Sequence, residues 1–290
     1  MHELLEQLLA EGPVITDGAW GTQLQERGLS SGDCPDAWNL SHPDFVEEVP
    51  RAYVESGSQI VLTNTFRATP LALASYELSD QTETINKAGA EISRRAAGDR
   101  ARVFGSIGPS GKMLMMGEVT EEELTQGFEA QIAGLVGGGV HGFVIETMAD
   151  VAEAKLAIQA AKATGLPVVG CVVFDAGADL DRTMMGLTPE QVAPELEAAG
   201  ADVIGANCGQ GIADYVKIAK RLHAATDKPI WIKANAGVPE MVDGEVVYRS
   251  TPADFAGHAQ ALLDAGANFI GGCCGTGPEF ISALVAETSS

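Results

Sequence analysis

Eight short β-rich runs, each followed by a stretch with helical periodicity, constrain the fold of this 290-residue chain more than any other feature. The expected strands are residues 13–17, 59–64, 102–107, 142–146, 167–174, 202–207, 229–234 and 267–272. The expected helices that follow them are 43–56, 69–97, 121–137, 150–164, 189–199, 212–226, 252–265 and 278–287. Eight such units in this length predict an α/β fold, a single (β/α)8 TIM barrel over residues 1–290.

A doubly wound open sheet also alternates strands and helices, and it is the main architectural alternative. That fold predicts a glycine-rich phosphate turn of the G-x-G-x-x-G type after the first strand. No such turn follows residues 13–17, so the barrel is favoured. Residues 2–11 are expected to form a short helix across the bottom of the barrel.

Composition excludes several classes of function. The hydrophobic content of 46% is typical of a globular chain, and the formal net charge of −22 disfavours nucleic-acid binding. No apolar run approaches membrane-spanning length, and the first residues lack the pattern of an export signal. These features predict a cytoplasmic, reducing setting, in which the five cysteines are free thiols or metal ligands.

Polar residues stand where the expected strands end. In a TIM barrel the chemistry lies on the loops that follow the carboxyl ends of the strands. The residues at those ends are Asp17, Thr63, Asn64, Ser106, Glu146, Asp175, Asn207, Cys208, Asn235, Cys273 and Cys274. If the strand count is correct, three cysteines converge on one mouth although they are far apart in the sequence.

The adjacent Cys273 and Cys274 need a role other than packing, because successive side chains on a strand point to opposite faces. A disulfide between neighbours is strained, and the odd number of cysteines argues against a disulfide framework. Together with Cys208 they fit a catalytic zinc site with three thiolates and one exchangeable position. Zinc deprotonates a bound thiol, so alkylation of a substrate thiol suits this site. Hydrolysis suits it less, because no histidine stands at a strand end.

Other strand-end residues indicate what the substrate carries. The carboxylates of Asp17 and Glu146 could hold an ammonium group, and backbone amides in residues 106–108 could hold a carboxylate. Thr63, Asn64 and Ser106 are further candidates for substrate binding. The predicted substrate is an amino acid with a thiol or selenol.

Five segments of this sequence resemble the homocysteine S-methyltransferase family, in the same order and over nearly the whole chain. They are DGAWGT (17–22), TNTF (63–66), IET (145–147), GANC (205–208) and GGCCGT (271–276). The resemblance implies a zinc-dependent barrel that methylates homocysteine to methionine. It also implies that Cys208, Cys273 and Cys274 bind zinc, and that Asp17 and Glu146 contact the amino group of homocysteine.

Two more segments, GPSG (108–111) and ANAGVP (234–239), look most like the homocysteine module of cobalamin-dependent methionine synthase. In that module the equivalent asparagine can occupy the fourth zinc position before substrate binds. The resemblance therefore implies that Asn235 is a temporary zinc ligand. No cobalamin-binding or folate-binding portion follows residue 290, so we expect either a fragment of a longer enzyme or a chain that works with a separate corrinoid protein.

The first expectation for the methyl donor is methylcobalamin on a partner protein or domain. Five methionines after strand ends could rim the entrance for such a donor: Met113, Met115, Met116, Met184 and Met185. S-methylmethionine and betaine are alternatives within the family. Alternatives of another class are a phosphate-binding barrel enzyme and a zinc-binding or thiol-binding protein without turnover.

Overall fold

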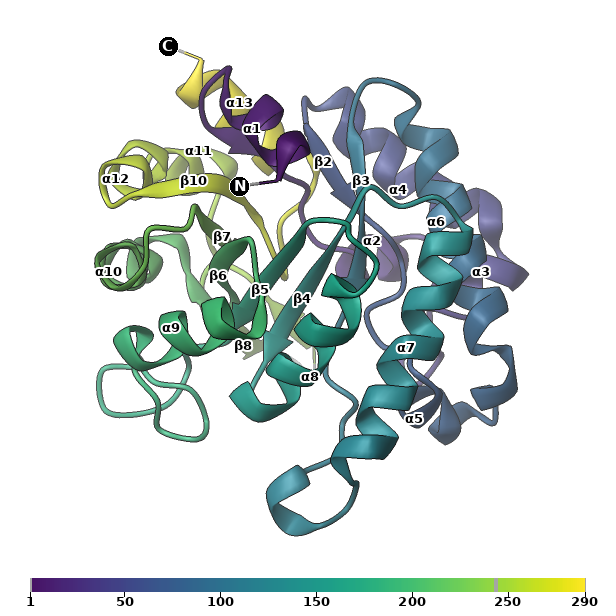
Figure 1. The fold of residues 1–290 in the computed structure, drawn as a ribbon. Helices are drawn as coiled ribbons and strands as arrows, with labels where there is room; N and C mark the ends of the chain where they lie inside the picture. The colour runs from purple at the N-terminus through teal and green to yellow at the C-terminus, as the bar shows by residue number, and fades with distance from the viewer. Residues whose placement is uncertain (1, 243–244, 290) are drawn as a thin grey trace.

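The computed structural model describes residues 2–242 and 245–289 and has a ring of eight strands at its centre (Figure 1). The strands are β1 (Val14–Ile15), β2 (Ile60–Leu62), β3 (Arg102–Ile107), β4 (Gly142–Met148), β5 (Val168–Val172), β6 (Val203–Gly211), β7 (Ile230–Asn235) and β10 (Ala267–Gly272). Their order around the sheet is β1, β10, β7, β6, β5, β4, β3, β2, with parallel pairing throughout. A parallel bridge between Thr16 and Ile60 joins the two ends. The predicted (β/α)8 barrel is confirmed.

Helices surround the ring and cover its outer face (Figure 1). The longer ones are α4 (Pro43–Glu55), α6 (Thr82–Ala97), α7 (Glu121–Gly137), α8 (Val151–Lys162), α9 (Pro189–Ala199), α10 (Ile212–Ala225) and α13 (Pro278–Thr288). The shorter ones are α1 (Glu3–Leu9), α2 (Gly21–Glu26), α3 (Trp38–Ser41), α5 (Pro70–Leu73), α11 (Pro252–Ala256) and α12 (Ala259–Asp264). The described residues also include three 3₁₀ turns: η1 (Ala74–Tyr76), η2 (Ser79–Gln81) and η3 (Leu114–Met116).

The predicted long helix over 69–97 is wrong, because the chain breaks into α5, η1 and η2 before α6 begins. Glu77 adopts a left-handed conformation with φ of 60°, which ends the first helical stretch. Hydroxyl groups then bind nearby carbonyls, from Ser79 to Pro70 and from Thr82 to Ser79, in place of helical bonds. The expected helix over 252–265 is likewise divided, into α11 and α12, at Gly257 and His258.

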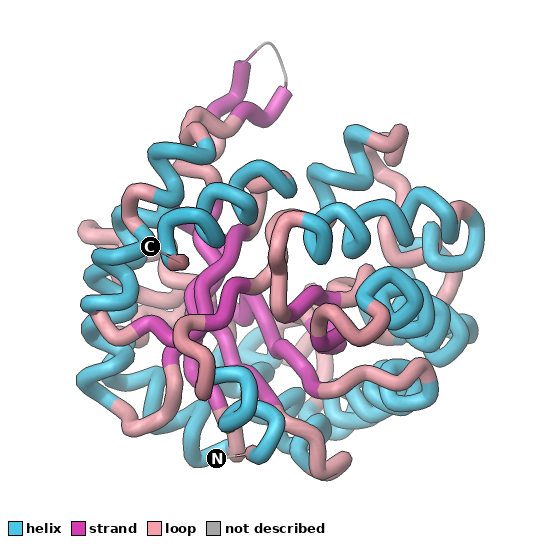
Figure 2. Tube along the Cα trace, turned by 90° about the horizontal axis from the view of Figure 1, so that it is seen from above, coloured by secondary structure: helices cyan, strands magenta, loops and turns pink. Residues whose placement is uncertain are grey.

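A second, two-stranded sheet was not predicted. Strands β8 (Glu240–Val242) and β9 (Glu245–Val247) pair in antiparallel fashion after β7 and stand out from the body of the molecule (Figure 2). Two apolar side chains of this sheet are exposed, Met241 to 70% and Val246 to 56%. Residues 243–244 lie outside the described residues.

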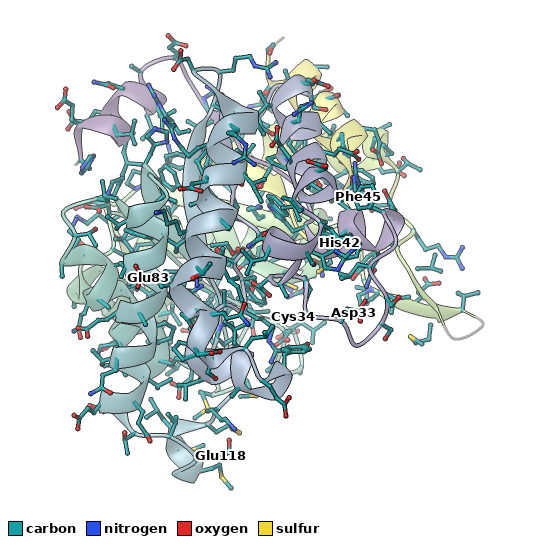
Figure 3. All side chains as sticks on the ribbon, turned by 90° about the vertical axis from the view of Figure 1, so that its right-hand side faces the viewer. Asp33, Cys34, His42, Phe45, Glu83 and Glu118 are labelled. Atoms are coloured by element: carbon teal, nitrogen blue, oxygen red, sulfur yellow. The ribbon has the colours of Figure 1, made fainter. Side chains whose placement is uncertain are left out.

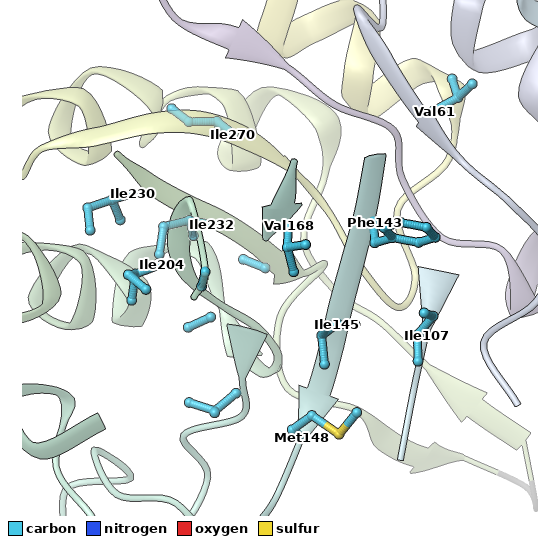
Figure 4. Close-up of a cluster of buried hydrophobic side chains, with 14 of the residues drawn as sticks. Val61, Ile107, Phe143, Ile145, Met148, Val168, Ile204, Ile230, Ile232 and Ile270 are labelled. Carbon is cyan, nitrogen blue, oxygen red and sulfur yellow. The ribbon is translucent and has the colours of Figure 1, made fainter. Parts of the chain in front are cut away.

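Side chains alternate between two apolar clusters along each strand. One cluster packs between the strands and the helices, and Figure 4 shows it at residues such as Phe143, Ile145 and Ile232. The other fills the inside of the barrel and includes Leu5 from α1, so the predicted helix near the start closes the bottom of the barrel.

The inward face changes from apolar to polar toward the mouth. On β3, buried Phe104 is followed two residues later by Ser106. On β4 Glu146 follows Val144 by the same step, and on β7 a lysine follows Trp231. Because every second side chain of a strand points inward, the polar residues at the ends of several strands face one site inside the barrel.

None of the helices in the described ranges is both long and apolar enough to cross a membrane. The cytoplasmic location stays a prediction from composition.

Candidate active site and metal centre

Three cysteine sulfurs meet at the mouth of the barrel. Cys208 lies near the carboxyl end of β6, and Cys273 and Cys274 follow β10; their sulfur atoms all lie within 4.8 Å of one another. Cys208 Sγ is 3.9 Å from Cys274 Sγ. A tetrahedral zinc with zinc–sulfur bonds of about 2.3 Å requires sulfurs about 3.8 Å apart, so the spacing fits that metal. The other cysteines, Cys34 and Cys171, are buried in apolar clusters; Cys34 lies on the first long loop (Figure 3).

The backbone is shaped so that neighbouring side chains can face the same centre. Cys208 has a φ of 63°, a left-handed conformation that a residue other than glycine adopts at a cost of about 1–2 kcal/mol. This conformation interrupts the alternation of β6, so both Asn207 and Cys208 face the site. After β10 the chain turns: Thr276 donates its N–H and its hydroxyl to the Cys273 carbonyl, at 3.1 and 2.7 Å. The turn lets the adjacent cysteines serve one site.

Glycine is required just before the cysteine pair. A Cβ on Gly271 would collide with the Thr16 hydroxyl, and one on Gly272 would collide with the Thr276 hydroxyl. The GG in GGCCGT therefore lets β10 lie close against β1 and against its own following turn.

The three thiols interact strongly. Hydrogen bonds from the Cys273 and Cys274 thiols lower the pKa of Cys208 to about 3. Hydrogen bonding to Cys208 raises the pKa of Cys273 well above its usual range, and the same contact raises that of Cys274 to about 11. The cluster thus readily holds one thiolate, whereas three thiolates in this buried place require a cation. A divalent metal ion would supply that charge.

Asn235 and Tyr248 flank the sulfurs. Asn235 Oδ1 accepts a hydrogen bond from the Cys274 N–H at 3.1 Å, and its side chain also hydrogen-bonds to Cys208. Asn235 thus lies beside the cluster, where a temporary ligand would have to be; that role stays a prediction. Burial, with the Cys274 sulfur as hydrogen-bond partner, raises the pKa of Tyr248.

A cavity of about 290 Å³ opens next to the sulfurs. Its wall contains most of the residues that the sequence nominates as a site: Thr63, Asn64, Ser106, Glu146, Cys208, Cys273 and Cys274. Apolar surface comes from Ala19, Trp20, Pro35, Leu62 and Phe66. The structure therefore brings the three cysteines and four of the five candidate substrate-binding residues to one cavity, whereas Asp17 and Asn235 are not among the residues of its wall.

Both oxygens of the Asp17 carboxylate already have partners within the protein. It is fully buried, and Lys233 Nζ approaches its Oδ1 to 2.5 Å. The other oxygen, Oδ2, accepts hydrogen bonds from the Leu62 N–H at 2.8 Å and from the Trp20 ring N–H at 3.1 Å. Burial alone would lower the pKa of Lys233, but the carboxylates of Asp17 and Glu146 raise it. A substrate ammonium at Asp17 must therefore share this carboxylate with Lys233.

Glu146 lines the cavity and is fixed on two sides. Its Oε1 accepts a hydrogen bond from the Ser106 hydroxyl at 2.5 Å, and its Oε2 accepts one from Asn207 at 3.2 Å. Burial raises the pKa of Glu146, while Lys233 and Ser106 oppose that rise. A carboxylate oriented in this way can receive a substrate ammonium.

The remaining candidates for substrate binding, Thr63 and Asn64, form hydrogen bonds with other groups of the protein. The Thr63 hydroxyl contacts the Thr65 hydroxyl at 2.6 Å, and the Asn64 side chain donates to the Pro35 carbonyl at 2.7 Å. The expectation that amides of 106–108 hold a substrate carboxylate is not supported at two of the three positions. The Ser106 N–H donates to Thr63, and the Gly108 N–H donates to a loop carbonyl.

Sequence reasoning missed three residues that shape the site: Asn207, Lys233 and Tyr248. Lys233 had a signal, because a lysine on the inward face of an apolar strand must find a buried partner. Asn207 was noted only as a strand end beside Cys208. Nothing in the sequence indicated Tyr248, because its position depends on the unpredicted β8–β9 hairpin.

Methionine synthases of Mycobacterium leprae (strain TN) and Mycobacterium tuberculosis (strain ATCC 25618 / H37Rv) are each 28% identical to the chain, over 99% of its length. The chain spans about a quarter (25%) of the length of each. The metallated form of the homocysteine methyltransferase MmuM from Escherichia coli has the same fold, with a TM-score of 0.81. That likeness covers 97% of this chain and 99% of MmuM at 23% identity.

A sequence profile of the homocysteine S-methyltransferase family matches residues 14–288. The match runs from β1 to α13, so it includes the whole barrel and each strand end that forms the cavity. The chain therefore belongs to the homocysteine S-methyltransferase family.

Proposed function

We propose that this chain methylates homocysteine to methionine and that Cys208, Cys273 and Cys274 hold a zinc ion for this reaction. The observation that carries the proposal is the group of three sulfurs within 4.8 Å in the wall of the same cavity as Glu146. Three thiolates leave one zinc position for a substrate, as expected of a catalytic site. When bound, zinc would supply Lewis acidity that makes the homocysteine sulfur a nucleophile at neutral pH.

The chain's own residues would bind and orient the amino acid. Glu146, fixed by Ser106 and Asn207, would receive the ammonium group of homocysteine. Asp17 would act from behind this position, by sharing its carboxylate between Lys233 and the substrate. Trp20 and Phe66 would exclude water from the reacting sulfur. Thr63 and Asn64 would keep the adjoining wall of the cavity in shape.

We propose methylcobalamin on a partner protein or on another domain as the methyl donor. Support comes from the relatives named methionine synthase, of which this chain matches about a quarter (25%). A second cavity of about 240 Å³ is lined by Met113, Met115, Met184 and Met185. The loop that ends near Glu118 extends beyond the start of α7 and carries the first two of these (Figure 3). Such soft, adaptable side chains suit contact with a bulky donor.

The proposal is tested by parallel assays of methionine formation from homocysteine with three different methyl donors. We expect zinc-dependent methionine formation from homocysteine and methylcobalamin, and less from S-methylmethionine or betaine. The double variant Met184→Gln and Met185→Gln should slow transfer from a protein-bound donor, because the polar amides disrupt its contact, while leaving the KM for homocysteine unchanged. Unaltered transfer kinetics would exclude the methionine-lined cavity as the donor entrance. Turnover with one of the small donors alone would reassign the donor, and absence of turnover with all three would count against the function.

A further inference from the structure

Asn207 joins three strand ends of the site through one side chain. It lies on β6, directly before Cys208, and is fully buried. Its Oδ1 accepts a hydrogen bond from the Thr147 N–H at 2.7 Å, and its Nδ2 donates to the Thr147 hydroxyl at 2.7 Å. Nδ2 also donates to Glu146 Oε2 at 3.2 Å and lies 3.9 Å from Cys273 Sγ. It therefore contacts both the carboxylate of the cavity and a candidate metal ligand.

Its neighbours fix the orientation of this amide. A backbone N–H can only donate, so the oxygen of Asn207 must face Thr147. The NH₂ group then faces Glu146 and Cys273, which both accept hydrogen bonds. Thr147 itself has a φ of 58°, an uncommon left-handed conformation that its two hydrogen bonds with Asn207 hold in place.

We propose that Asn207 is a positioning residue that links the ammonium-binding carboxylate of Glu146 to the metal ligand Cys273. The inference rests on the proposed function for the identity of substrate and metal. Without Asn207, Glu146 retains the hydrogen bond from Ser106 on one oxygen only, so its other oxygen loses its fixed direction. Cys273 loses an N–H donor that stabilises negative charge on its sulfur. One substitution therefore changes both substrate binding and the metal centre.

The variants Asn207→Ala and Asn207→Ser test this link. Alanine removes both the donor and the acceptor. Serine replaces the amide by a hydroxyl group, which can still form a hydrogen bond, and provides a second variant if alanine prevents folding. The matched control is Asn86→Ala in α6, because Asn86 is also fully buried and donates to two backbone carbonyls, of Ala68 and Thr82, at 2.8 Å each. A merely structural role for a buried amide predicts the same behaviour for Asn207 and Asn86.

Three readouts are compared: the KM for homocysteine, the affinity for zinc in competition with a chelator, and the sulfur-to-cobalt charge-transfer band of the cobalt(II)-substituted protein. We expect Asn207→Ala to raise the KM and weaken zinc binding by about 10–100-fold each, as for other partners of metal ligands. The band should move to longer wavelength, because a thiolate without its N–H donor gives up an electron more easily. Asn86→Ala should change only stability.

A KM, zinc affinity and cobalt band all equal to those of wild type would overturn the role of Asn207, provided that wild type binds metal and forms methionine. Changes confined to stability, as in Asn86→Ala, would also overturn it. A wild-type protein that binds neither zinc nor cobalt would instead contradict the proposed function, so the two failures are distinguishable.

Discussion

Cys273→Ser is expected to abolish both zinc binding and methionine formation while leaving the barrel folded. Even a residue that only contacts a metal ligand contributes about 10–100-fold to metal affinity, so loss of a ligand should weaken zinc binding by more than about 100-fold. The sulfur of Cys273 lies within 4.8 Å of the other two, so its loss leaves only two thiolates for the metal. Metal content after exhaustive dialysis, measured by mass spectrometry, checks this result.

Cys34→Ser is the matched control for that experiment. Cys34 is also buried, but it packs with Ala68, Leu73 and Ile85 and does not belong to the group of three sulfurs. We expect full zinc content and full turnover in this variant. If Cys273→Ser retains zinc and activity to the same extent as Cys34→Ser, the three cysteines do not form the metal site, and a barrel enzyme without zinc becomes the better explanation.

Lys233→Met should produce the largest loss of stability among substitutions of charged residues in the site. Lys233 is 2% exposed and forms an ion pair with the fully buried Asp17 at 2.5 Å. Methionine matches the lysine stem but leaves the carboxylate of Asp17 buried without its cation. Removal of one partner from a buried pair costs about 3–5 kcal/mol in the free energy of unfolding, which denaturant titration can measure.

A surface ion pair provides the control. Lys155 Nζ lies 2.6 Å from Glu195 Oε2, but these side chains are 37% and 51% exposed. Lys155→Met should therefore cost at most about 1 kcal/mol. The double variant Asp17→Asn with Lys233→Met should recover part of the lost stability, because the negative charge of Asp17 is then removed together with its cation. Equal losses for Lys233→Met and Lys155→Met would show that Asp17 does not depend on its buried partner.

The fold was predictable because each strand and most helices have local signals. α7 and α9 begin and end where the sequence predicts. A capping box marks the start of each helix, at Thr120 for α7 and at Thr188 for α9. The strand count also predicted that Cys208 lies at the same mouth of the barrel as Cys273 and Cys274. These inferences need only periodicity, turn residues and the rule that barrel strands end on one face.

Other features depend on contacts between distant segments, and local patterns do not contain them. The pairing of Lys233 with Asp17 joins β7 to the segment after β1, past the intervening β10, and changes how Asp17 could meet a substrate. Asn207 acquires its importance from Thr147, Glu146 and Cys273, on two other strand ends. The break between α5 and α6 arises from side-chain hydrogen bonds that compete with a helix over residues with adequate helical propensity.

The central claim is that three cysteines of this chain hold zinc and leave one position for the homocysteine sulfur. X-ray absorption at the zinc edge, recorded on the same sample with and without homocysteine, tests it most directly. We predict three sulfur ligands and one lighter atom, such as the Asn235 oxygen, before homocysteine is added, and four sulfur ligands afterwards. Absence of zinc, or a sulfur count that homocysteine does not change, would contradict the account.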